Sequence, residues 1–258
     1  MASPAARRMT LSVIPGLPLV REGDDLAALI FAAANAAGEP LAAGDILVIA
    51  QKIVSKAEGR TRDLGDIVPS KRAVSLGHVA QKDPRLIELV LGEAEDVLRV
   101  RPGVIVVAHK RGWVLANAGI DRSNVEGGDR NRILLLPEDP DASAKDIRQR
   151  LKRVSGYDVG VIVADSIGRA WRLGTVGTAI GASGVRCLTD LRGQHDLYGR
   201  ALETSEIGSA DEIAAAASLL MSQGAEGSPV VVVRGLDEAL GEGRAKDLVR
   251  PLATDMFR

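Results

Sequence analysis

The chain has 258 residues, of which 46% are hydrophobic and 2% aromatic, so it can bury a substantial core and is too apolar for a disordered chain. Its 33 Lys and Arg residues nearly balance its 34 Asp and Glu residues, which argues against a general nucleic-acid or membrane-surface binder. The single cysteine, Cys187, excludes an intramolecular disulfide and a cysteine-rich zinc site. Because no apolar run approaches the ~18 residues of a membrane span, we expect a cytoplasmic protein.

Short runs rich in Val and Ile predict buried strands, and stretches with helical spacing of apolar residues lie between them. In chain order the sequence predicts a helix over 23–38, a strand over 45–55, a helix over 83–98, strands over 103–110, 113–119 and 132–137, a helix over 143–154, a strand over 159–165, a helix over 209–224 and a strand over 229–235. The last of these helices begins with Ser209, and Glu212 stands three residues on, at the capping-box position.

These elements predict a mixed α+β fold with antiparallel pairing and flanking helices, built as one large domain or as two interlocked ones. The strands on either side of "HKRGW" must be antiparallel, because so short a connection cannot make a crossover. Helices and strands do not alternate strictly, so a Rossmann sheet is not expected, and there is no G-x-x-x-x-G-K-[ST] motif of a P-loop. The glycines of "GTVGTAIGASG" are open to two interpretations, close backbone packing or a ligand-lining segment.

Two groups of polar residues at strand ends are candidates for a ligand site. Gln51, Lys52 and Lys56 follow a strongly apolar strand, where they either bind an anionic ligand or simply keep a strand end solvated. Asp121 and Asp165 each follow a predicted strand, and each alone is more often a turn or cap residue.

Taken together, the two acids favour a divalent cation. Carboxylate oxygens with the neighbouring hydroxyl of Ser166 are the ligands that Mg²⁺ and Mn²⁺ prefer. Arg169 and Arg172, close by in "GRAWR", point to a negatively charged ligand on that metal. Without a cation between them, we expect Asp121 and Asp165 to repel each other.

Five stretches in order, "PGLPLVREGDDL", "GDILVIAQKIVSKAEGR", "NAGIDRSNV", "VIVADSIGRAWRLGTVGTAIG" and "MSQGAEGSPVVVVRG", resemble the coenzyme F420-0:L-glutamate ligase family. The resemblance implies one ligase domain over residues 1–258, without the flavin-reductase-like domain that follows it in some relatives, and an intertwined homodimer. It also implies GTP-dependent addition of L-glutamate to the terminal carboxylate of F420-0 through an acyl phosphate, releasing GDP and phosphate, with further γ-linked glutamates as an extension.

The resemblance also carries site residues onto this chain. It implies that Asp121 and Asp165 hold one Mg²⁺ or Mn²⁺, that Ser166 and Gln223 contact a second such ion, and that K⁺ is a further candidate ion. Lys56, Arg169 and Arg172 are the implied catalytic residues, which neutralise phosphate charge. The residues implied for GTP are Pro15, Gly16, Leu17, Pro18, Gln51, Lys52, Lys56, Asn124, Met221, Ser222, Gln223, Gly224, Ala225, Glu226, Gly227 and Ser228.

Two departures from the family pattern affect the site. The family often has "DTFGRPWR" where this chain has Ser166, Ile167 and Ala170, and "MGQ" where this chain has Ser222. Ser166 keeps the hydroxyl oxygen, whereas the other changes alter the surroundings of the substrate and nucleotide. Two other functions stay open: a non-catalytic GTP-binding regulatory protein, and a ligase on the same scaffold for a different acid and amine.

Overall fold

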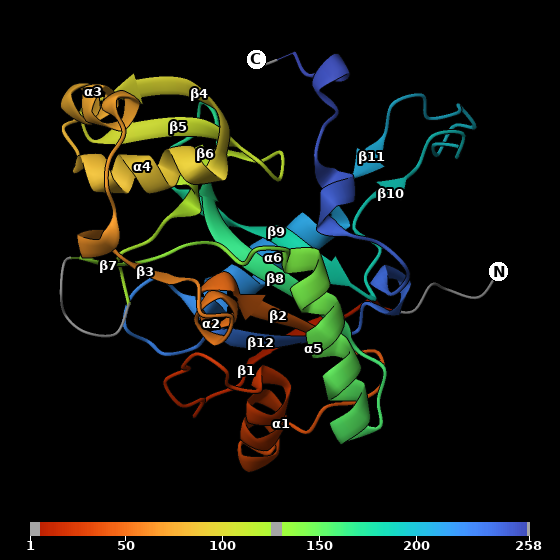
Figure 1. Cartoon of the computed structure of the whole chain (residues 1–258). Coiled ribbons are helices and arrows are strands. Elements are labelled where there is room, and N and C mark those ends of the chain that lie inside the picture. Colours follow the sequence, from red (N-terminus) through yellow and green to blue (C-terminus); the bar gives the residue numbers. More distant parts are fainter. Residues whose placement is uncertain (1–5, 125–130, 257–258) are drawn as a thin grey trace.

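The computed structural model describes residues 6–124 and 131–256, and a five-stranded sheet forms its centre (Figure 1). In spatial order this sheet contains β1 (Thr10–Val13), β12 (Val230–Arg234), β2 (Ile46–Ala50), β8 (Gly160–Gly168) and β9 (Thr175–Ser183). β2 and β8 run parallel, and the other neighbouring strands are antiparallel. The mixed pairing confirms the predicted α+β class and the expectation that the sheet is not of the Rossmann type.

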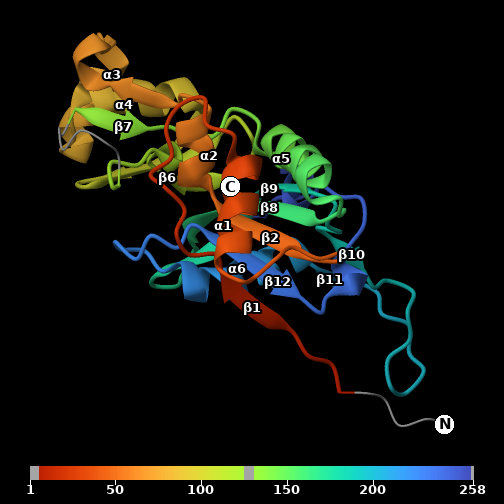
Figure 2. The same cartoon turned by 90° about the horizontal axis from the view of Figure 1, so that it is seen from below.

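Helices cover both faces of the central sheet. Alternate residues of β2 point to opposite sides, so Leu47 and Ile49 join one buried cluster, and Ile46 and Val48 join another. The first cluster is shared with α1 (Leu26–Ala36), α2 (Gln51–Ala57) and α5 (Pro140–Ser155), and the second with α6 (Ser209–Met221). Figure 2 shows α1 lying across its face of the sheet. A sheet buried on both faces explains why its strands read as continuous Val and Ile runs.

A second group of elements lies beside the central sheet (Figure 1). It contains α3 (Lys71–Ala80) and α4 (Pro84–Glu93), which pack on an antiparallel sheet of β4 (Ala94–Arg101), β5 (Val104–His109) and β6 (Val114–Ala116). The β5–β6 pair is the hairpin predicted around "HKRGW". Two short ladders complete the strands, β3 (Thr61–Asp63) with β7 (Arg132–Leu134), and β10 (Thr189–Asp190) with β11 (Glu206–Ile207).

Two predicted elements each divide into a helix and a strand. The strand predicted over 45–55 ends at Ala50, because the next seven residues form α2, which buries Ile53 and Val54. The helix predicted over 83–98 ends at Glu93, because residues from Ala94 onward pair with β5 as strand β4. In both cases tertiary pairing or burial overrides the local apolar pattern.

Other boundaries also differ from the prediction. The strands predicted over 113–119 and 132–137 are shorter, since the ladders cover only 114–116 and 132–134. The capping box at Ser209 is wrong: Gly208 is the N-cap of α6, and Ser209 Oγ lies 2.9 Å from Thr189 Oγ1 instead. Among the residues that the structure describes, no helix is both long and apolar enough to cross a membrane.

Two glycines of the 174–184 segment serve close packing, and one of them, Gly177, also lines a cavity. A Cβ atom at Gly177 would lie 2.3 Å from the carbonyl oxygen of Ala214 in α6, and one at Gly181 would lie 2.2 Å from that of Pro140 in α5. Neither position has room for a side chain, so these two glycines let α6 and α5 lie directly against β9.

Candidate functional site

A cavity of about 490 Å³ opens where β2 and β8 stop pairing. The parallel ladder ends at the pair Ala50–Ala164, after which the chain continues into α2 on one side and to Asp165 on the other. The cavity also contacts the segment 17–20, the end of α6 and the loop 222–229. A crevice at the carboxyl ends of parallel strands is a common position for ligand sites in sheet proteins.

The cavity brings together most of the residues that the sequence singled out. The predicted residues in its lining are Leu17, Pro18, Gln51, Lys52, Lys56, Asn124, Asp165, Ser166, Met221, Ser222, Gln223, Gly224, Ala225, Gly227 and Ser228. Those outside the lining are Pro15, Gly16, Asp121, Arg169, Arg172 and Glu226. Segments more than 200 residues apart in the chain therefore meet at one opening.

Asp121 lies next to the cavity and forms an ion pair with one of its lysines. Lys52 Nζ is 2.6 Å from Asp121 Oδ2 and donates a hydrogen bond of 2.7 Å to Ser123 Oγ. Ser123 donates to Asp121 Oδ1 from both its backbone nitrogen and its hydroxyl, at 2.8 Å each. Burial raises the pKa of the Asp121 carboxyl, but the hydrogen bonds from Lys52 and Ser123 outweigh it and hold the pKa below its usual value. The expected repulsion between Asp121 and Asp165 is present, because the charge of Asp121 raises the pKa of Asp165, but the Lys52 ammonium offsets part of the charge of Asp121.

Asp165 has a different environment. It lies inside β8 rather than after it, since β8 continues to Gly168 as a hairpin with β9 after its pairing with β2 has ended. The backbone nitrogen of Ser166 donates to Asp165 Oδ1 at 2.8 Å. Burial, with a smaller contribution from the charge of Asp121, raises the pKa of Asp165 to about 6. A partly buried carboxylate with a raised pKa at a cavity wall is a position where a bound cation would be stabilised.

The oxygen donors at this wall suit one kind of metal site. The residues that the structure describes contain no cluster of three or more His, Cys, Asp or Glu side chains that could hold a metal alone. Two carboxylates and the Ser166 hydroxyl fit a Mg²⁺ or Mn²⁺ ion whose other ligands are phosphate oxygens and water. A cation bound at Asp121 Oδ2 would have to displace the Lys52 ammonium from it.

Hydrogen bonds to Glu226 constrain the conformation of the loop that follows α6. The Glu226 carboxylate accepts hydrogen bonds from Ser222 Oγ and from the backbone nitrogen of Gly224, each at 2.8 Å. Ser222 has φ 58° and ψ −171°, a backbone conformation that is essentially restricted to glycine. Asn124 Nδ2 donates to the carbonyl oxygen of Gly224 at 3.2 Å and so joins this loop to the segment that carries Asp121.

The two predicted catalytic arginines lie on the β8–β9 turn, outside the cavity lining. Both are exposed, and Arg169 Nη2 donates to the carbonyl oxygen of Leu173 at 3.3 Å. Lys56, the third predicted catalytic residue, lines the cavity from α2. The structure therefore brings the lysines, but not the arginines, to the opening.

Several polar positions of the site were not predicted, including Ser218 in the lining. Ser55 Oγ donates to Gln51 Oε1 at 3.0 Å, and both side chains are buried, so Ser55 fixes the orientation of the Gln51 amide. Ser123 joins Lys52 to Asp121, and Gly177 forms part of the lining. The four-residue spacing of Gln51 and Ser55 would have revealed their contact had α2 been predicted as a helix.

This fold and cavity define the class of the protein: a mixed α+β scaffold with a small-molecule cavity at the ends of two parallel strands, outside the P-loop and Rossmann groups. The family model for F420-0:Gamma-glutamyl ligase matches residues 16–235. The chain belongs to this family of ligases.

Relatives from several archaea are similar over nearly their whole length. The chain is 46% identical to "Coenzyme F420:L-glutamate ligase" of Methanothermobacter thermautotrophicus, over 97% of this chain and 99% of that protein. Identity is also 46% to the proteins of the same name from Methanopyrus kandleri, over 96% and 98%, and from Archaeoglobus fulgidus, over 97% and 97%. The family assignment confirms the resemblance found in the sequence.

Proposed function

We propose that this protein joins L-glutamate to the terminal carboxylate of coenzyme F420-0 in a GTP-dependent reaction. The observation that carries this proposal is the 46% identity to a coenzyme F420:L-glutamate ligase over 97% of the chain. The cavity supports it, because the residues implied for GTP by the resemblance converge there from distant parts of the sequence.

The proposed chemistry has two steps. A carboxylate oxygen of F420-0 attacks the γ-phosphorus of GTP, and the bond from this phosphorus to the β,γ-bridging oxygen breaks. GDP is released, and the carboxylate has become an acyl phosphate. The amine nitrogen of L-glutamate then attacks the acyl carbon, the carbon–oxygen bond to phosphate breaks, and the amine loses a proton. The products are the amide, GDP and phosphate. A second round on the new terminal glutamate would extend the tail.

The cavity residues have roles that suit this chemistry. The ammonium groups of Lys52 and Lys56 lie on α2 at the cavity wall, where they would attract and neutralise phosphate oxygens. Backbone groups of the loop 222–228, held by Glu226, would position the nucleotide. We assign the divalent cations to the Asp121, Asp165, Ser166 and Gln223 oxygens, where they would screen the repulsion between the two reacting anions.

We further propose that the active form is a homodimer with its nucleotide sites near the subunit boundary. Large apolar side chains are exposed on the β8–β9 turn and on α6, which packs against β9: Leu173 is 99% exposed and Leu219 is 84% exposed. Exposed apolar side chains that gather on one side of a protein are typical of an association surface. A boundary there would also place Arg169 and Arg172 near a second subunit.

One experiment tests the activity. The purified protein is incubated with F420-0, L-glutamate, GTP and Mn²⁺, and the products are identified by mass spectrometry together with GDP and phosphate. We expect one or more added glutamates, with GDP and phosphate released only when both acid and amine are present. Binding of GTP without release of GDP would instead indicate a regulatory protein, and GDP release with another acid or amine would indicate a different ligase.

A further inference from the structure

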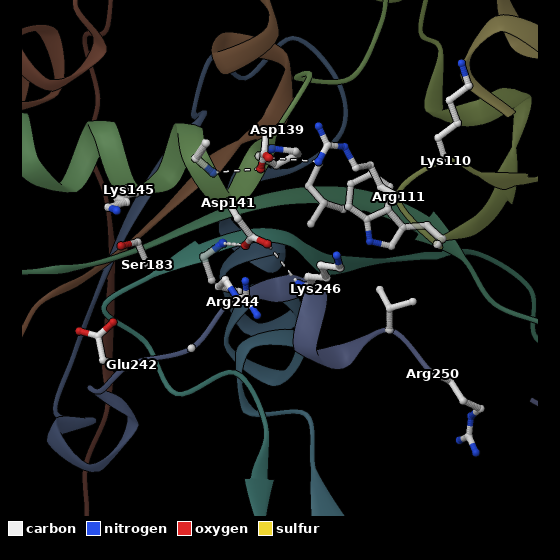
Figure 3. A pocket seen from close by; sticks show the side chains of 18 of the residues that line it. Lys110, Arg111, Asp139, Asp141, Lys145, Ser183, Glu242, Arg244, Lys246 and Arg250 are labelled. Carbon is white, nitrogen blue, oxygen red and sulfur yellow. Dashed lines mark hydrogen bonds and ion pairs between the residues drawn. The ribbon is translucent and has the colours of Figure 1, made fainter. Parts of the chain in front are cut away.

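A second cavity, larger than the candidate site, lies away from it. It has a volume of about 1210 Å³ and is enclosed by α5, by the turn 110–113 of the β5–β6 hairpin and by the segment 242–252. None of the candidate catalytic, nucleotide-binding or metal-binding residues named from the sequence lines it. Lysine and arginine residues from all three of these segments line it, and Figure 3 shows their side chains.

The walls of this cavity, which we call the α5 cavity, are held together by specific contacts. Asp141 accepts hydrogen bonds from the backbone nitrogens of Ala182 and Ala245, both at 2.8 Å, and of Lys246 at 3.3 Å. It therefore fastens the segment 242–252 to β9 and to the start of α5. At the opposite wall, a Cβ atom at Gly112 would lie 2.5 Å from Val249 Cγ1, so the hairpin turn lies directly against the same segment. These contacts fix the positions of the cavity walls relative to one another.

Among the described residues, eight Lys and Arg side chains line the α5 cavity against six Asp and Glu side chains, and three of the six acids, Asp139, Asp141 and Asp158, are engaged by partners within the protein. The carboxylate of Asp141 is used by the three backbone nitrogens just described. Asp139 accepts from Ala142 at the start of α5 and pairs with Arg111 at 3.1 Å. Asp158 pairs with Arg148 at 3.0 Å and with Lys152 at 2.9 Å. These carboxylates therefore present little uncompensated negative charge to a ligand.

Several cations of the lining have no such partner. Within the described residues, the side chains of Lys145, Lys246 and Arg250 form neither a hydrogen bond nor an ion pair, and Lys110 forms no ion pair within 4.0 Å. Arg244 pairs only with Asp247, which lies outside the lining. A concave wall with unpaired cations focuses a positive potential into the cavity and attracts anions.

We propose that the α5 cavity is a second ligand site, for a small polyanion that carries several carboxylate or phosphate groups. Lys145 from α5 and Lys246 and Arg250 from the C-terminal segment bind its charged groups. The partly buried indole of Trp113, which contacts the His109 ring at a tilt of 37° with 5.2 Å between ring centroids, provides a flat apolar wall for the body of the ligand. The site is independent of the proposed GTP chemistry, because it shares no lining residue with the other cavity.

The test measures anion binding by isothermal titration calorimetry on the full chain after exhaustive dialysis into metal-free buffer that contains no polyanion. Two probes separate the sources of charge: citrate, which has three carboxylates, and inorganic pyrophosphate. We expect at least one of them to bind, with an affinity that falls as NaCl is raised. The double variant Lys145→Gln/Lys246→Gln should lose at least tenfold in that affinity, and Lys71→Gln/Lys82→Gln, which removes the same charge outside the lining, should bind as the parent does.

A second measurement separates the two cavities. The Lys145→Gln/Lys246→Gln variant should bind GTP with the affinity of the parent and should show the same melting temperature, since the exposed lysines it replaces have no partner to lose. Failure of both probes to bind would overturn the proposal. Binding that the double variant retains in full would also overturn it, because the anion would then occupy another site. Neither result depends on whether the protein proves to be a ligase.

Discussion

The ammonium of Lys52 lies 2.6 Å from Asp121 Oδ2, with no ligand needed to hold it there. Lys52 belongs to α2 and Asp121 to the segment that follows the β5–β6 hairpin, so this ion pair joins the central sheet to the second group of elements. The same carboxylate is the proposed ligand of a divalent cation. Lys52 and a metal would therefore compete for one oxygen.

Replacing Lys52 should strengthen metal binding by the nucleotide-free protein. Lys52→Gln removes a positive charge and the group that covers Asp121 Oδ2, so we expect the affinity for Mn²⁺ alone to rise by about tenfold, a difference of ~1.4 kcal/mol. The affinity for GTP should fall, because Lys52 would no longer contact phosphate. Electron paramagnetic resonance of free Mn²⁺ measures the first effect. Lys110→Gln, outside this cavity, is the charge-matched control, and unchanged or weaker Mn²⁺ binding in Lys52→Gln would contradict the competition.

Asp165 gives the metal-free protein a specific pH dependence. Its pKa of about 6 exceeds the usual 3.8, so between these values the folded state binds a proton that the unfolded state does not. Burying the ionised form therefore costs stability above pH 6, by about 3 kcal/mol at most, and this cost disappears as the pH falls through 6 toward 4. Asp165→Asn lacks the ionised form and should be more stable than the parent at pH 7.5, with a difference that shrinks to nothing near pH 4.

Urea unfolding of both proteins in the presence of a chelator measures this difference at several pH values. Asp190→Asn is a useful contrast, because the hydrogen bond from Arg192 lowers the pKa of Asp190 to about 2. Its substitution should not stabilise the protein at pH 7.5. A pH-independent effect of Asp165→Asn would show that packing, rather than burial of charge, distinguishes the two side chains.

The sequence predicted the three middle strands of the central sheet, β12, β2 and β8, but not its outer strands β1 and β9. Buried strands need continuous apolar runs, and "ILVIA" and "VVVV" have no other stable position than the middle of a covered sheet. The grouping of Gln51, Asp165 and Gln223 came from the family resemblance, since no local pattern shows that residues so far apart share one opening.

What the sequence missed depends on tertiary contacts. Residues 94–98 continue the helical spacing of α4, yet they pair with β5, because strand pairing stabilises them more than another helical turn would. The partner of Asp121 was also missed. Lys52 lies 69 positions earlier and reaches Asp121 only because α2 turns it out of the sheet toward the hairpin. The large cavity beside α5 has no sequence signature, since its lysines and arginines look like ordinary surface charge.

The proposed homodimer can be tested at its exposed apolar residues. If Leu173 and Leu219 lie at the subunit boundary, a glutamate at either position would be buried in the dimer and would strongly destabilise it. On a free surface the same glutamate would have little effect on stability. We therefore expect Leu173→Glu or Leu219→Glu to shift the protein to a monomer in sedimentation velocity experiments while its circular dichroism stays unchanged. The control is Val68→Glu, on the other group of elements, where the parent side chain is 87% exposed. Dimers that persist in both leucine variants, or a monomeric parent, would contradict this boundary.

Ser222 offers the most direct test of the loop geometry at the cavity. Its φ of 58° and ψ of −171° fall in a region that costs a side-chain-bearing residue about 1–3 kcal/mol, whereas glycine adopts it freely. Ser222→Gly and Ser222→Ala both lose the hydrogen bond to Glu226, so their difference isolates the backbone conformation. Glycine should be more stable than alanine here by about 1 kcal/mol, the reverse of the order in a helix. Ala28→Gly on the exposed side of α1 is the control, because in a helix alanine should be more stable than glycine. Urea unfolding at one pH measures the stability of all three variants. If Ser222→Ala is as stable as Ser222→Gly, residue 222 does not adopt this backbone conformation in solution. The position of the Gly224 backbone, which depends on that conformation, would then be different.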